Sequence, residues 1–266
     1  MFTDSHCHLN FPELKEKIPE IRQSMREAQV TRALCICTTL EEFDDVHKLA
    51  TSYHNFWCTV GVHPDSEDVQ EPCIEDLVKR ASLEKVVGIG ETGLDYYRLR
   101  ERTLANMEWQ RERFRVHIRA ACITGKPLVV HTRSASNDTI AILKEESANA
   151  AKQHGQVRGV FHCFTETQAV AKAALDLGFY ISFSGVITFK NAGDIREVAR
   201  FVPLDRLLIE TDSPYLAPMP YRGKTNSPSY VPFVAKQLAE IKQESLETIA
   251  KATSQNFERL FTGINA

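Results

Sequence analysis

The stretch MFTDSHCHL, residues 1–9, decides the fold, because a short strand-like run leads directly into His-Cys-His. A run of this length that ends in polar residues is typical of a strand buried on both faces of a sheet. Four more runs end in the same way, at a histidine or a carboxylate: KVVGIGETG (85–93), PLVVHT (127–132), VRGVFHC (157–163) and RLLIETD (206–212). Side chains at the C-terminal tips of such strands can converge on one point if the sheet closes into a barrel. The chain therefore predicts a polar site at the mouth of a barrel.

Eight segments of the chain are predicted to be strands. They are 2–8, 33–39, 56–62, 86–91, 127–132, 157–162, 179–184 and 206–211. Amphipathic stretches lie between them, and the longest, 101–124, is followed by Gly125 and Pro127, which are helix stop signals. Eight strand-and-helix units in about 250 residues match the size of a (β/α)8 TIM barrel, and this α/β fold is the prediction. A doubly wound open sheet, the alternative, would usually carry a glycine-rich fingerprint where this chain has His-Cys-His.

The segments between and after the strands give no sign of a second domain. No Ser/Gly linker, charge block or low-complexity tract interrupts the 266 residues, so residues 1–266 are predicted to form one barrel domain. A last helix is predicted over 245–261. The Pro-rich segment 213–230 follows the eighth strand, and it is expected to form a loop over the barrel mouth.

The charge of the chain limits how it can meet nucleic acid. The formal net charge is −3, whereas a protein that holds nucleic acid only by neutralising phosphates would be far more basic. A polyanionic substrate would therefore have to be bound by a local basic cluster or through metal ions. The charge excludes a general nucleic-acid coating protein but not an enzyme.

The cysteines and the N-terminus indicate where the protein works. The seven cysteines are odd in number and none has CxxC spacing, so free thiols are expected, which fit a reducing compartment. The sequence has no signal-peptide pattern, and no apolar run reaches the length of about 18 residues that a membrane helix needs. The expectation is a cytoplasmic protein without membrane contact, and no obligate protein partner is inferred.

Four imidazoles and two carboxylates stand at the ends of predicted strands and form a candidate metal site: His6, His8, Glu91, His131, His162 and Asp212. The first two histidines are separated by one residue and so point to the same side of a strand, where both can reach one ion. A carboxylate buried at position 91 needs a partner that offsets its desolvation, either an arginine or a pair of cations that it bridges. The mixed nitrogen and oxygen ligands suit two divalent metal ions, and Mg, Mn or Zn are the expected cofactors.

A site of this composition predicts hydrolytic chemistry. Two ions about 3.5–4 Å apart can hold a hydroxide between them and stabilise the attacking and leaving oxygens of a phosphoryl displacement. Asp212 would touch the nucleophilic water and is the predicted general base, and with Glu91 it forms the predicted catalytic pair. Glu210 and Asp95 are expected to lie behind the ligands, where they can orient a ligand or bind an arginine.

Several longer motifs follow one another in a recognisable order. They are DSHCHL (4–9), GVHP (61–64), GETGLDYY (90–97), VVHTR (129–133), HCF (162–164), YISFSG (180–185), ETDSPYLAP (210–218) and RGKTNSP (222–228). Over essentially its whole length the chain resembles the TatD family of metal-dependent deoxyribonucleases. The resemblance implies a (β/α)8 barrel of the amidohydrolase type and a divalent-metal phosphodiesterase. The expected activity is that of a 3′→5′ exonuclease on single-stranded DNA, with a metal-bridged hydroxide as the nucleophile.

The resemblance also implies how the ligands divide between the two ions. One ion would be held by His6, His8, Glu91 and Asp212. The second would be held by Glu91, His131 and His162, so that Glu91 bridges both. His63 of the GVHP motif would face the same cavity and contact the substrate rather than a permanent ion.

DNA as the substrate requires donors for phosphate oxygens and, for unpaired bases, aromatic surfaces. Arg133, Arg222 and Lys224 are the predicted phosphate contacts, because they follow the fifth and eighth strands and carry the positive charge that a phosphate requires. The aromatic residues of the predicted mouth loops are Tyr96, Tyr97, Phe164 and Tyr215. Such rings can stack unpaired bases, or they can pack the loops against the barrel.

Two other functions stay open on the residues alone. A small-molecule amidohydrolase or lactonase could use the same two ions, because the ligand set does not distinguish attack on a carbonyl from attack on phosphorus. A non-catalytic protein that binds a partner through the same surface is less favoured, because all candidate ligands are present. The basic residues near the mouth and the family resemblance favour a phosphodiester substrate.

Overall fold

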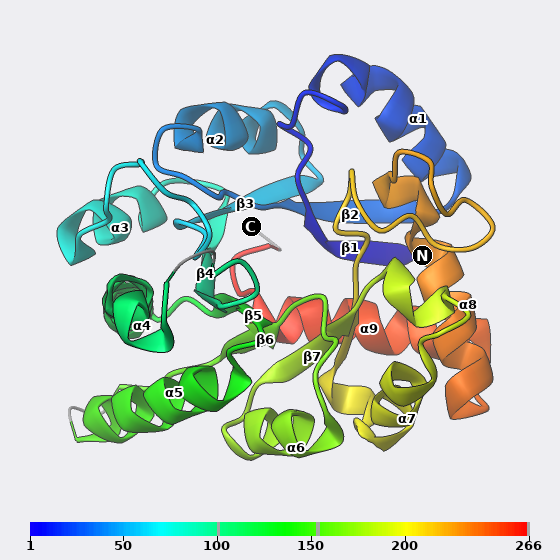
Figure 1. Ribbon diagram of the computed structural model, residues 1–266. Coiled ribbons are helices and arrows are strands. Elements are labelled where there is room, and N and C mark those ends of the chain that lie inside the picture. Colours follow the sequence, from blue (N-terminus) through cyan, green and yellow to red (C-terminus); the bar gives the residue numbers. More distant parts are fainter. Residues whose placement is uncertain (100–101, 153–154, 265–266) are drawn as a thin grey trace.

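The computed structural model describes residues 1–99, 102–152 and 155–264. Eight parallel strands form one sheet whose spatial order is that of the sequence. The strands are β1 (Phe2–Cys7), β2 (Val30–Cys35), β3 (Phe56–Val60), β4 (Val86–Asp95), β5 (Leu128–Arg133), β6 (Gly159–Phe161), β7 (Tyr180–Phe183) and β8 (Leu207–Ile209). Helices form a ring around these strands, as Figure 1 shows, so the predicted (β/α)8 barrel is confirmed.

The helices alternate with the strands along the chain. They are α1 (Ile18–Glu27), α2 (Phe43–Ser52), α3 (Ile74–Ala81), α4 (Glu108–Thr124), α5 (Ser136–Ala151), α6 (Gln168–Asp176), α7 (Gly193–Phe201), α8 (Val231–Lys242) and α9 (Leu246–Leu260). Single 3₁₀ turns lie at η1 (Lys15–Lys17), η2 (Leu104–Met107), η3 (Gly185–Thr188), η4 (Leu204–Arg206) and η5 (Pro228–Tyr230). No helix in the described parts of the chain is long and apolar enough to cross a membrane.

The predicted helix 101–124 is divided at its start. Residue 101 lies outside the described residues, η2 forms one turn, and the regular helix α4 begins only at Glu108. Thr103 and Asn106 form a capping box that starts the 3₁₀ turn, which the amphipathic pattern alone could not separate from the helix. At the other end Gly125 has φ 65°, the left-handed conformation that glycine adopts readily, so α4 ends where the glycine predicted.

The observed strands end within two residues of the predicted ones except in two cases, β2 and β4. β2 runs from Val30 to Cys35 rather than over 33–39, because the amide of Thr39 turns to the carboxylate of Glu42 at 3.2 Å instead of continuing the ladder. β4 does not stop at residue 91 but continues to Asp95, because its backbone keeps pairing with β5 up to Arg133. The polar residues after position 91 therefore still belong to the barrel wall.

The barrel closes between β8 and β1 at the level of the candidate metal ligands. The amide of Asp212 donates to the carbonyl of His6 at 2.9 Å, and the amide of His8 donates to the carbonyl of Ser213 at 2.8 Å. A parallel bridge joins Cys7 and Ser213 at the same place. The seam of the barrel thus fixes the backbone on both sides of its ligands.

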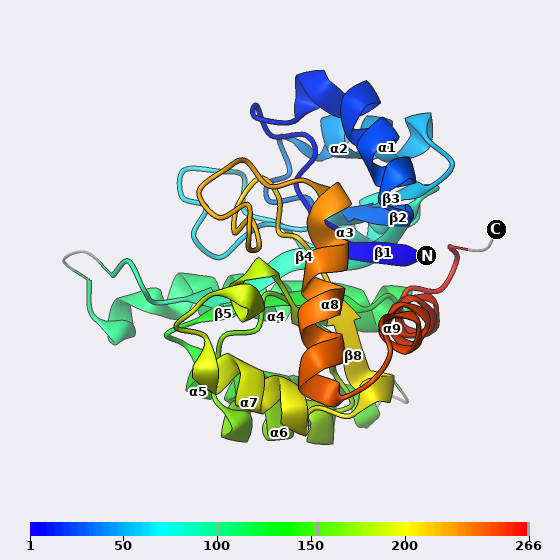
Figure 2. The same ribbon diagram turned by 90° about the vertical axis from the view of Figure 1, so that its right-hand side faces the viewer.

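The opposite end of the barrel is filled by α9. This helix starts after Ser245, whose hydroxyl accepts the amide of Thr248 at 3.0 Å, within one residue of the predicted start. Phe257, Leu260 and Phe261 belong to one buried cluster with inward-facing side chains of the strands. Figure 2 shows α9 beside the N-terminus, on the side away from the loop after β8. An apolar plug at one end leaves the other end for the polar site.

The cysteines bear out the expectation of free thiols. All seven are unpaired, and four of them, Cys7, Cys35, Cys37 and Cys58, are buried. These four lie in the core between the sheet and the helices, where a thiol packs as a small apolar group.

Candidate metal centre

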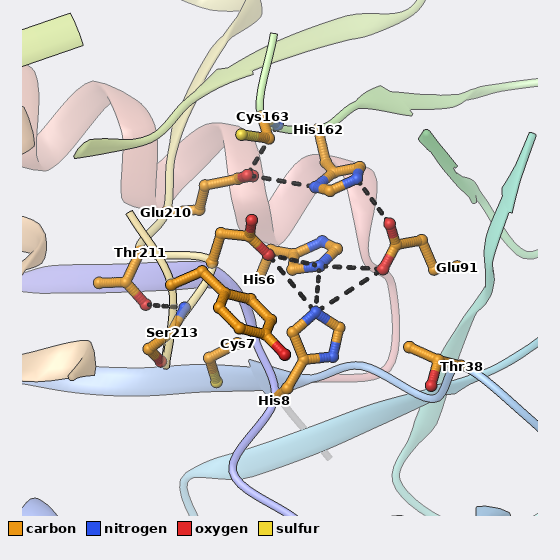
Figure 3. A network of polar contacts seen from close by, with 12 residues as sticks. His6, Cys7, His8, Thr38, Glu91, His162, Cys163, Glu210, Thr211 and Ser213 are labelled. Atoms are coloured by element: carbon orange, nitrogen blue, oxygen red, sulfur yellow. Dashed lines mark hydrogen bonds and ion pairs between the residues drawn. The ribbon is translucent and has the colours of Figure 1, made fainter. Parts of the chain in front are cut away.

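The predicted ligands from β1 lie side by side at the barrel mouth. The Nε2 atoms of His6 and His8 are 3.2 Å apart. Strand alternation explains this, because Cys7 between them points the other way and its thiol donates to the carbonyl of Leu34 at 3.3 Å. Figure 3 shows both imidazoles directed toward Glu91.

Asp212 completes the group at the seam. Its Oδ1 lies 3.5 Å from Nε2 of His6 and 3.4 Å from Nε2 of His8. The backbone of Asp212 has φ 56°, a left-handed conformation that costs energy outside glycine and that recurs at functional sites. The hydrogen bond from its amide to the carbonyl of His6 holds it there.

Glu91 stands between two pairs of imidazoles and is only 3% exposed. Its Oε2 lies 3.3 Å from Nε2 of His6 and 3.7 Å from Nε2 of His8. Its other oxygen, Oε1, lies 2.8 Å from Nε2 of His162 and 3.3 Å from Nδ1 of His131. Each carboxylate oxygen therefore faces a different pair of rings, which is the arrangement of a carboxylate that bridges two cations.

Carboxylates lie behind the rings of β5 and β6. Nε2 of His131 is 3.0 Å from Oδ2 of Asp95, and Nδ1 of His162 is 3.3 Å from Oε1 of Glu210. Because an ionised carboxylate only accepts hydrogen bonds, the ring nitrogen that faces it carries the proton. The other nitrogen of each ring points toward Glu91, and once it is deprotonated it would bind a cation through its lone pair, as in histidines that bind metals. The structure thus places Asp95 and Glu210 where the sequence predicted them, behind ligands.

His63 has the opposite arrangement. Its Nδ1 accepts the backbone amide of Asp65 at 3.0 Å, so the neutral ring carries its proton on Nε2. That Nε2 lies 3.4 Å from Oε1 of Glu91. A protonated nitrogen cannot bind a cation, so this geometry disfavours His63 as a ligand, although it lies near enough to Glu91 and His131 to share an ion.

The loop that carries His63 is fixed from α4. The guanidinium of Arg113 donates to the carbonyls of His63 and Ser66, both at 2.8 Å. His117, one turn later, accepts the amide of Val62 at 2.9 Å on Nε2. Burial lowers the pKa of His117 to about 4, so the ring is neutral and its Nε2 is free to accept. These contacts were not visible in the sequence, because they join α4 to a loop that lies far from it along the chain.

The imidazoles and carboxylates of the centre shift one another's pKa and so set their protonation states. Burial alone would raise the pKa of Glu91, but the charge of His162 and the hydrogen bond with His131 hold this pKa well below its usual range. Burial likewise would lower the pKa of His162, but Glu91 and Glu210 raise it well above the usual value. For Asp212, burial acts to raise the pKa, and the hydrogen bond with His8 outweighs it and lowers the pKa. The carboxylates are therefore ionised and ready to receive cations.

The donor set fits divalent metal ions. Three groups of side chains have their ligand atoms within 4.8 Å of one another: His6, His8 and Asp212; His6, Glu91 and His162; His63, Glu91 and His131. Imidazole nitrogens with carboxylate oxygens suit Zn, Mn, Co and Fe(II) better than they suit Mg, which prefers oxygen and water.

A cavity of about 720 Å³ opens above these residues. Arg133, a predicted phosphate contact, lines it, and so does Arg98, which the sequence reasoning passed over although it directly follows GLDYY. Arg222 and Lys224 do not line it. The Arg222 guanidinium lies 4.4 Å from the centre of the Phe189 ring, and the Lys224 ammonium lies 5.7 Å from that of Tyr221. Both side chains are exposed on the loop after β8.

The four aromatic residues of the mouth divide into two kinds. Tyr96 and Phe164 are buried, and the hydroxyl of Tyr96 donates to Asp138 at 2.8 Å, so these two pack the loops. Tyr97 and Tyr215 are 60% and 52% exposed. Phe11, which the sequence analysis did not single out, also lines the cavity and stacks on His8 with ring centres 4.6 Å apart.

The whole chain matches one known family. A family model described as TatD related DNase covers residues 3–262. The chain belongs to the TatD family. An uncharacterized metal-dependent hydrolase of Escherichia coli, YcfH, is 44% identical over 262 residues, which are 97% of this chain and 94% of that protein. The chain is accordingly a metal-dependent hydrolase, and the family resemblance of its motifs is confirmed.

Two further TatD proteins are informative. The protein named 3′-5′ ssDNA/RNA exonuclease TatD from Citrobacter rodentium is 34% identical over 240 residues, covering 88% of each chain. The crystal structure of YJJV, a TatD homologue from Escherichia coli K12, has a TM-score of 0.86 and 26% identity, and the match covers 98% of this chain and 97% of that one.

Proposed function

We propose that the chain hydrolyses phosphodiester bonds of single-stranded DNA from the 3′ end, with two divalent ions at the centre described above. The observation that carries this proposal is the position of Glu91, whose two oxygens face separate pairs of imidazoles. In this assignment His6, His8 and Asp212 would hold one ion, His131 and His162 would hold the other, and Glu91 would contribute to both. A related TatD protein carries the name of a single-strand exonuclease, which supports the substrate class.

The charges of the cavity support an anionic substrate only together with cations. The carboxylates of Asp65, Glu91, Asp95 and Asp212 line it, against the guanidinium groups of Arg98 and Arg133. These side chains alone would repel a phosphodiester. Two divalent ions reverse the balance, and the two guanidinium groups then add donors that match phosphate oxygens in pairs.

The residues of the chain have distinct tasks in this reaction. Bound divalent ions would lower the pKa of a nearby water molecule and offset the negative charge that develops on the phosphoryl oxygens. Asp212 lines the cavity with its carboxylate ionised, and it accepts the proton of the attacking water. His63 directs Nε2–H into the cavity, where it donates to an oxygen of the phosphodiester. Arg133, which lines the same cavity, orients the phosphate.

A small-molecule amidohydrolase or lactonase is the second candidate. The cavity volume of about 720 Å³ lies in the range of pockets that enclose small ligands, about 300–1,000 Å³. The absence of Arg222 and Lys224 from its lining also removes part of the basic cluster that favoured phosphate. The same ions and the same general base would serve attack on a carbonyl.

The free thiols support a reducing compartment, and we place the protein in the cytoplasm on that basis. The substrate is then intracellular nucleic acid. No protein partner is needed for the proposed reaction.

The proposed function is tested by incubating metal-stripped protein with single-stranded DNA labelled at its 3′ or its 5′ end. Reactions contain Mg²⁺, Mn²⁺ or EDTA, and Asp212→Asn controls for contaminating nucleases. We expect a ladder that depends on added metal, is lost in the variant and shortens the 5′-labelled strand stepwise from its 3′ end. Metal-loaded wild type that leaves DNA intact, but cleaves members of a lactone and amide panel, would favour the second candidate.

A further inference from the structure

Two aromatic side chains stand beside one half of the metal centre, on loops that begin at its ligands. The amide of Phe11 donates to the carbonyl of His8 at 3.2 Å, and the amide of Tyr215 donates to the carbonyl of Asp212 at 3.0 Å. Each ring thus lies three residues beyond a candidate ligand and is tied to it by one backbone hydrogen bond. The position of both rings relative to the centre is therefore set by short, closed turns.

Phe11 packs against His8, whereas the ring of Tyr215 stays partly open to the cavity. Phe11 stacks on His8 with an angle of 18° between the ring planes. The ring planes of Phe11 and Tyr215 meet at 70°, with ring centres 6.2 Å apart. Both line the cavity, yet Tyr215 is 52% exposed. A half-exposed aromatic ring at the rim of a cavity retains apolar surface that a ligand can cover.

The loop under Tyr215 is held firmly. The side-chain amide of the fully buried Asn226 donates to the carbonyl of Tyr215 at 2.6 Å and to that of Thr211 at 2.8 Å. Its own backbone amide donates to the carbonyl of Pro214 at 2.9 Å. The exposed ring therefore sits on a fixed support, which reduces the entropy lost when a flat ligand binds to it.

We propose that the unpaired base next to the scissile phosphodiester stacks on the ring of Tyr215, with Phe11 beside it, and we call these two rings the platform. This inference rests on the proposed function and names the part of the substrate that the cavity holds besides the phosphate. Aromatic rings bind single-stranded nucleic acid by stacking, which tolerates any base because every base has a flat face. A paired and stacked base has no free face, so the platform also favours single strands over duplexes.

The other exposed tyrosine of the mouth, Tyr97, is already in contact with an arginine side chain. The guanidinium of Arg133 lies 3.7 Å from the centre of the Tyr97 ring and covers one face of it. Tyr97 therefore holds a phosphate-binding side chain in place. We therefore expect the base to stack on the side of the cavity formed after β1 and β8, and the phosphate to be bound on the side formed by β4 and β5.

The test compares two oligonucleotides of equal length, one unmodified and one whose 3′-terminal nucleotides are abasic. On the unmodified strand we expect Tyr215→Ala to raise KM about 5- to 100-fold, the range for loss of one stacked base. Tyr215→Phe should have a KM close to that of wild type, because it keeps the aromatic ring on which the base stacks. On the abasic strand Tyr215→Ala and wild type should have the same KM. Phe201→Ala, which removes an exposed ring at the end of α7, is the matched control and should leave KM unchanged.

A binding measurement separates the platform from catalysis. Fluorescence anisotropy with a labelled, cleavage-resistant phosphorothioate strand and Mn²⁺ should show the same loss of affinity in Tyr215→Ala, with unchanged metal content. An equal loss on the abasic strand, or no loss on the unmodified one, would overturn the proposal. If wild type cleaves neither strand, the proposed function fails, while the dependence of binding on Tyr215 and on the base still decides the platform.

Discussion

The two halves of the metal centre are supported in different ways. On the side of β5 and β6, each imidazole has a carboxylate behind it, Asp95 for His131 and Glu210 for His162. On the side of β1, the Nδ1 atoms of His6 and His8 are buried and have no hydrogen-bond partner within the described ranges. Side chains orient the ligands of one half, whereas strand alternation and the barrel seam orient those of the other.

This difference shows in which half of the centre a substitution behind a ligand can lower the metal affinity. A residue behind a ligand fixes the ring and raises its basicity, and its loss typically lowers metal affinity about 10- to 100-fold. Only the half formed by His131 and His162 offers such residues. The rings of His6 and His8 have no hydrogen-bond partner on Nδ1 within the described residues, so no substitution can remove one there.

The largest effect is expected at the residue that joins the halves. Glu91→Gln keeps the shape but loses the charge and turns one oxygen into an amino group, so both ions should weaken. The loss of kcat should exceed about 100-fold, the upper range for residues that only lie behind ligands. Metal content by atomic emission and kcat on single-stranded DNA measure the two effects. Full occupancy of both sites in this variant would reject the bridging role.

A smaller effect, confined to one half, is expected from Asp95→Asn and Glu210→Gln. Either change should lower the affinity for one ion about 10- to 100-fold and leave the other ion in place. Calorimetric titration of metal-stripped protein resolves the two sites. Asp138→Asn is the matched control, because this carboxylate contacts Tyr96 and Arg111 rather than a ligand. Equal weakening of both ions would contradict the difference between the halves.

The pH dependence of metal binding should differ between the halves as well. Burial lowers the pKa of His131, but hydrogen bonds to Asp95 and Glu91 outweigh this and raise it, and the pKa of His162 is raised too. Burial lowers the pKa of His6, so this ring is already neutral at pH 7. A raised pKa keeps a ring protonated to higher pH, and a protonated ring cannot bind a cation.

We therefore expect the ion on the side of His131 and His162 to release more protons on binding, and to be lost first as pH falls. Calorimetry in two buffers of different ionisation enthalpy counts the protons at each step. On the other side only His8 has a raised pKa, because burial is outweighed there by the hydrogen bond with Asp212. Equal proton release at both steps would remove this distinction.

The smallest effect on metal binding is expected at His63. His63→Ala should leave both ion affinities within about twofold, because its cavity-facing nitrogen carries the proton. The kcat should still fall by about 100-fold, the size of effect seen when one donor to a reacting oxygen is removed. His47→Ala, a change at a half-buried histidine of α2 away from the centre, controls for the loss of an imidazole. Loss of one ion in His63→Ala would make His63 a ligand.

The barrel and the convergence of its candidate ligands at one end could be predicted from the sequence because the signal is local. A strand buried on both faces must be apolar along its length, so the change to a polar residue at His131 or His162 is visible in the chain itself. The end of β4 was not visible, because the ladder to Asp95 is a matter of backbone pairing with β5.

Other parts of the site depend on contacts between distant segments. Which nitrogen of His63 carries the proton is set by the amide of Asp65, and no sequence pattern reports it. The path of the loop after β8 depends on the buried Asn226, so the exposed positions of Arg222 and Lys224 away from the cavity could not be foreseen. Phe11 lies in a short turn after His8, and only its stacking there makes it part of the cavity.

The most direct test of the central claim is a stepwise titration of metal-stripped protein with Mn²⁺, in which bound metal and cleavage of single-stranded DNA are measured in the same samples. The account predicts two bound ions, and cleavage that rises with the second and is lost in Glu91→Gln. Saturation at one ion with full cleavage, or two bound ions without cleavage of DNA, would contradict it.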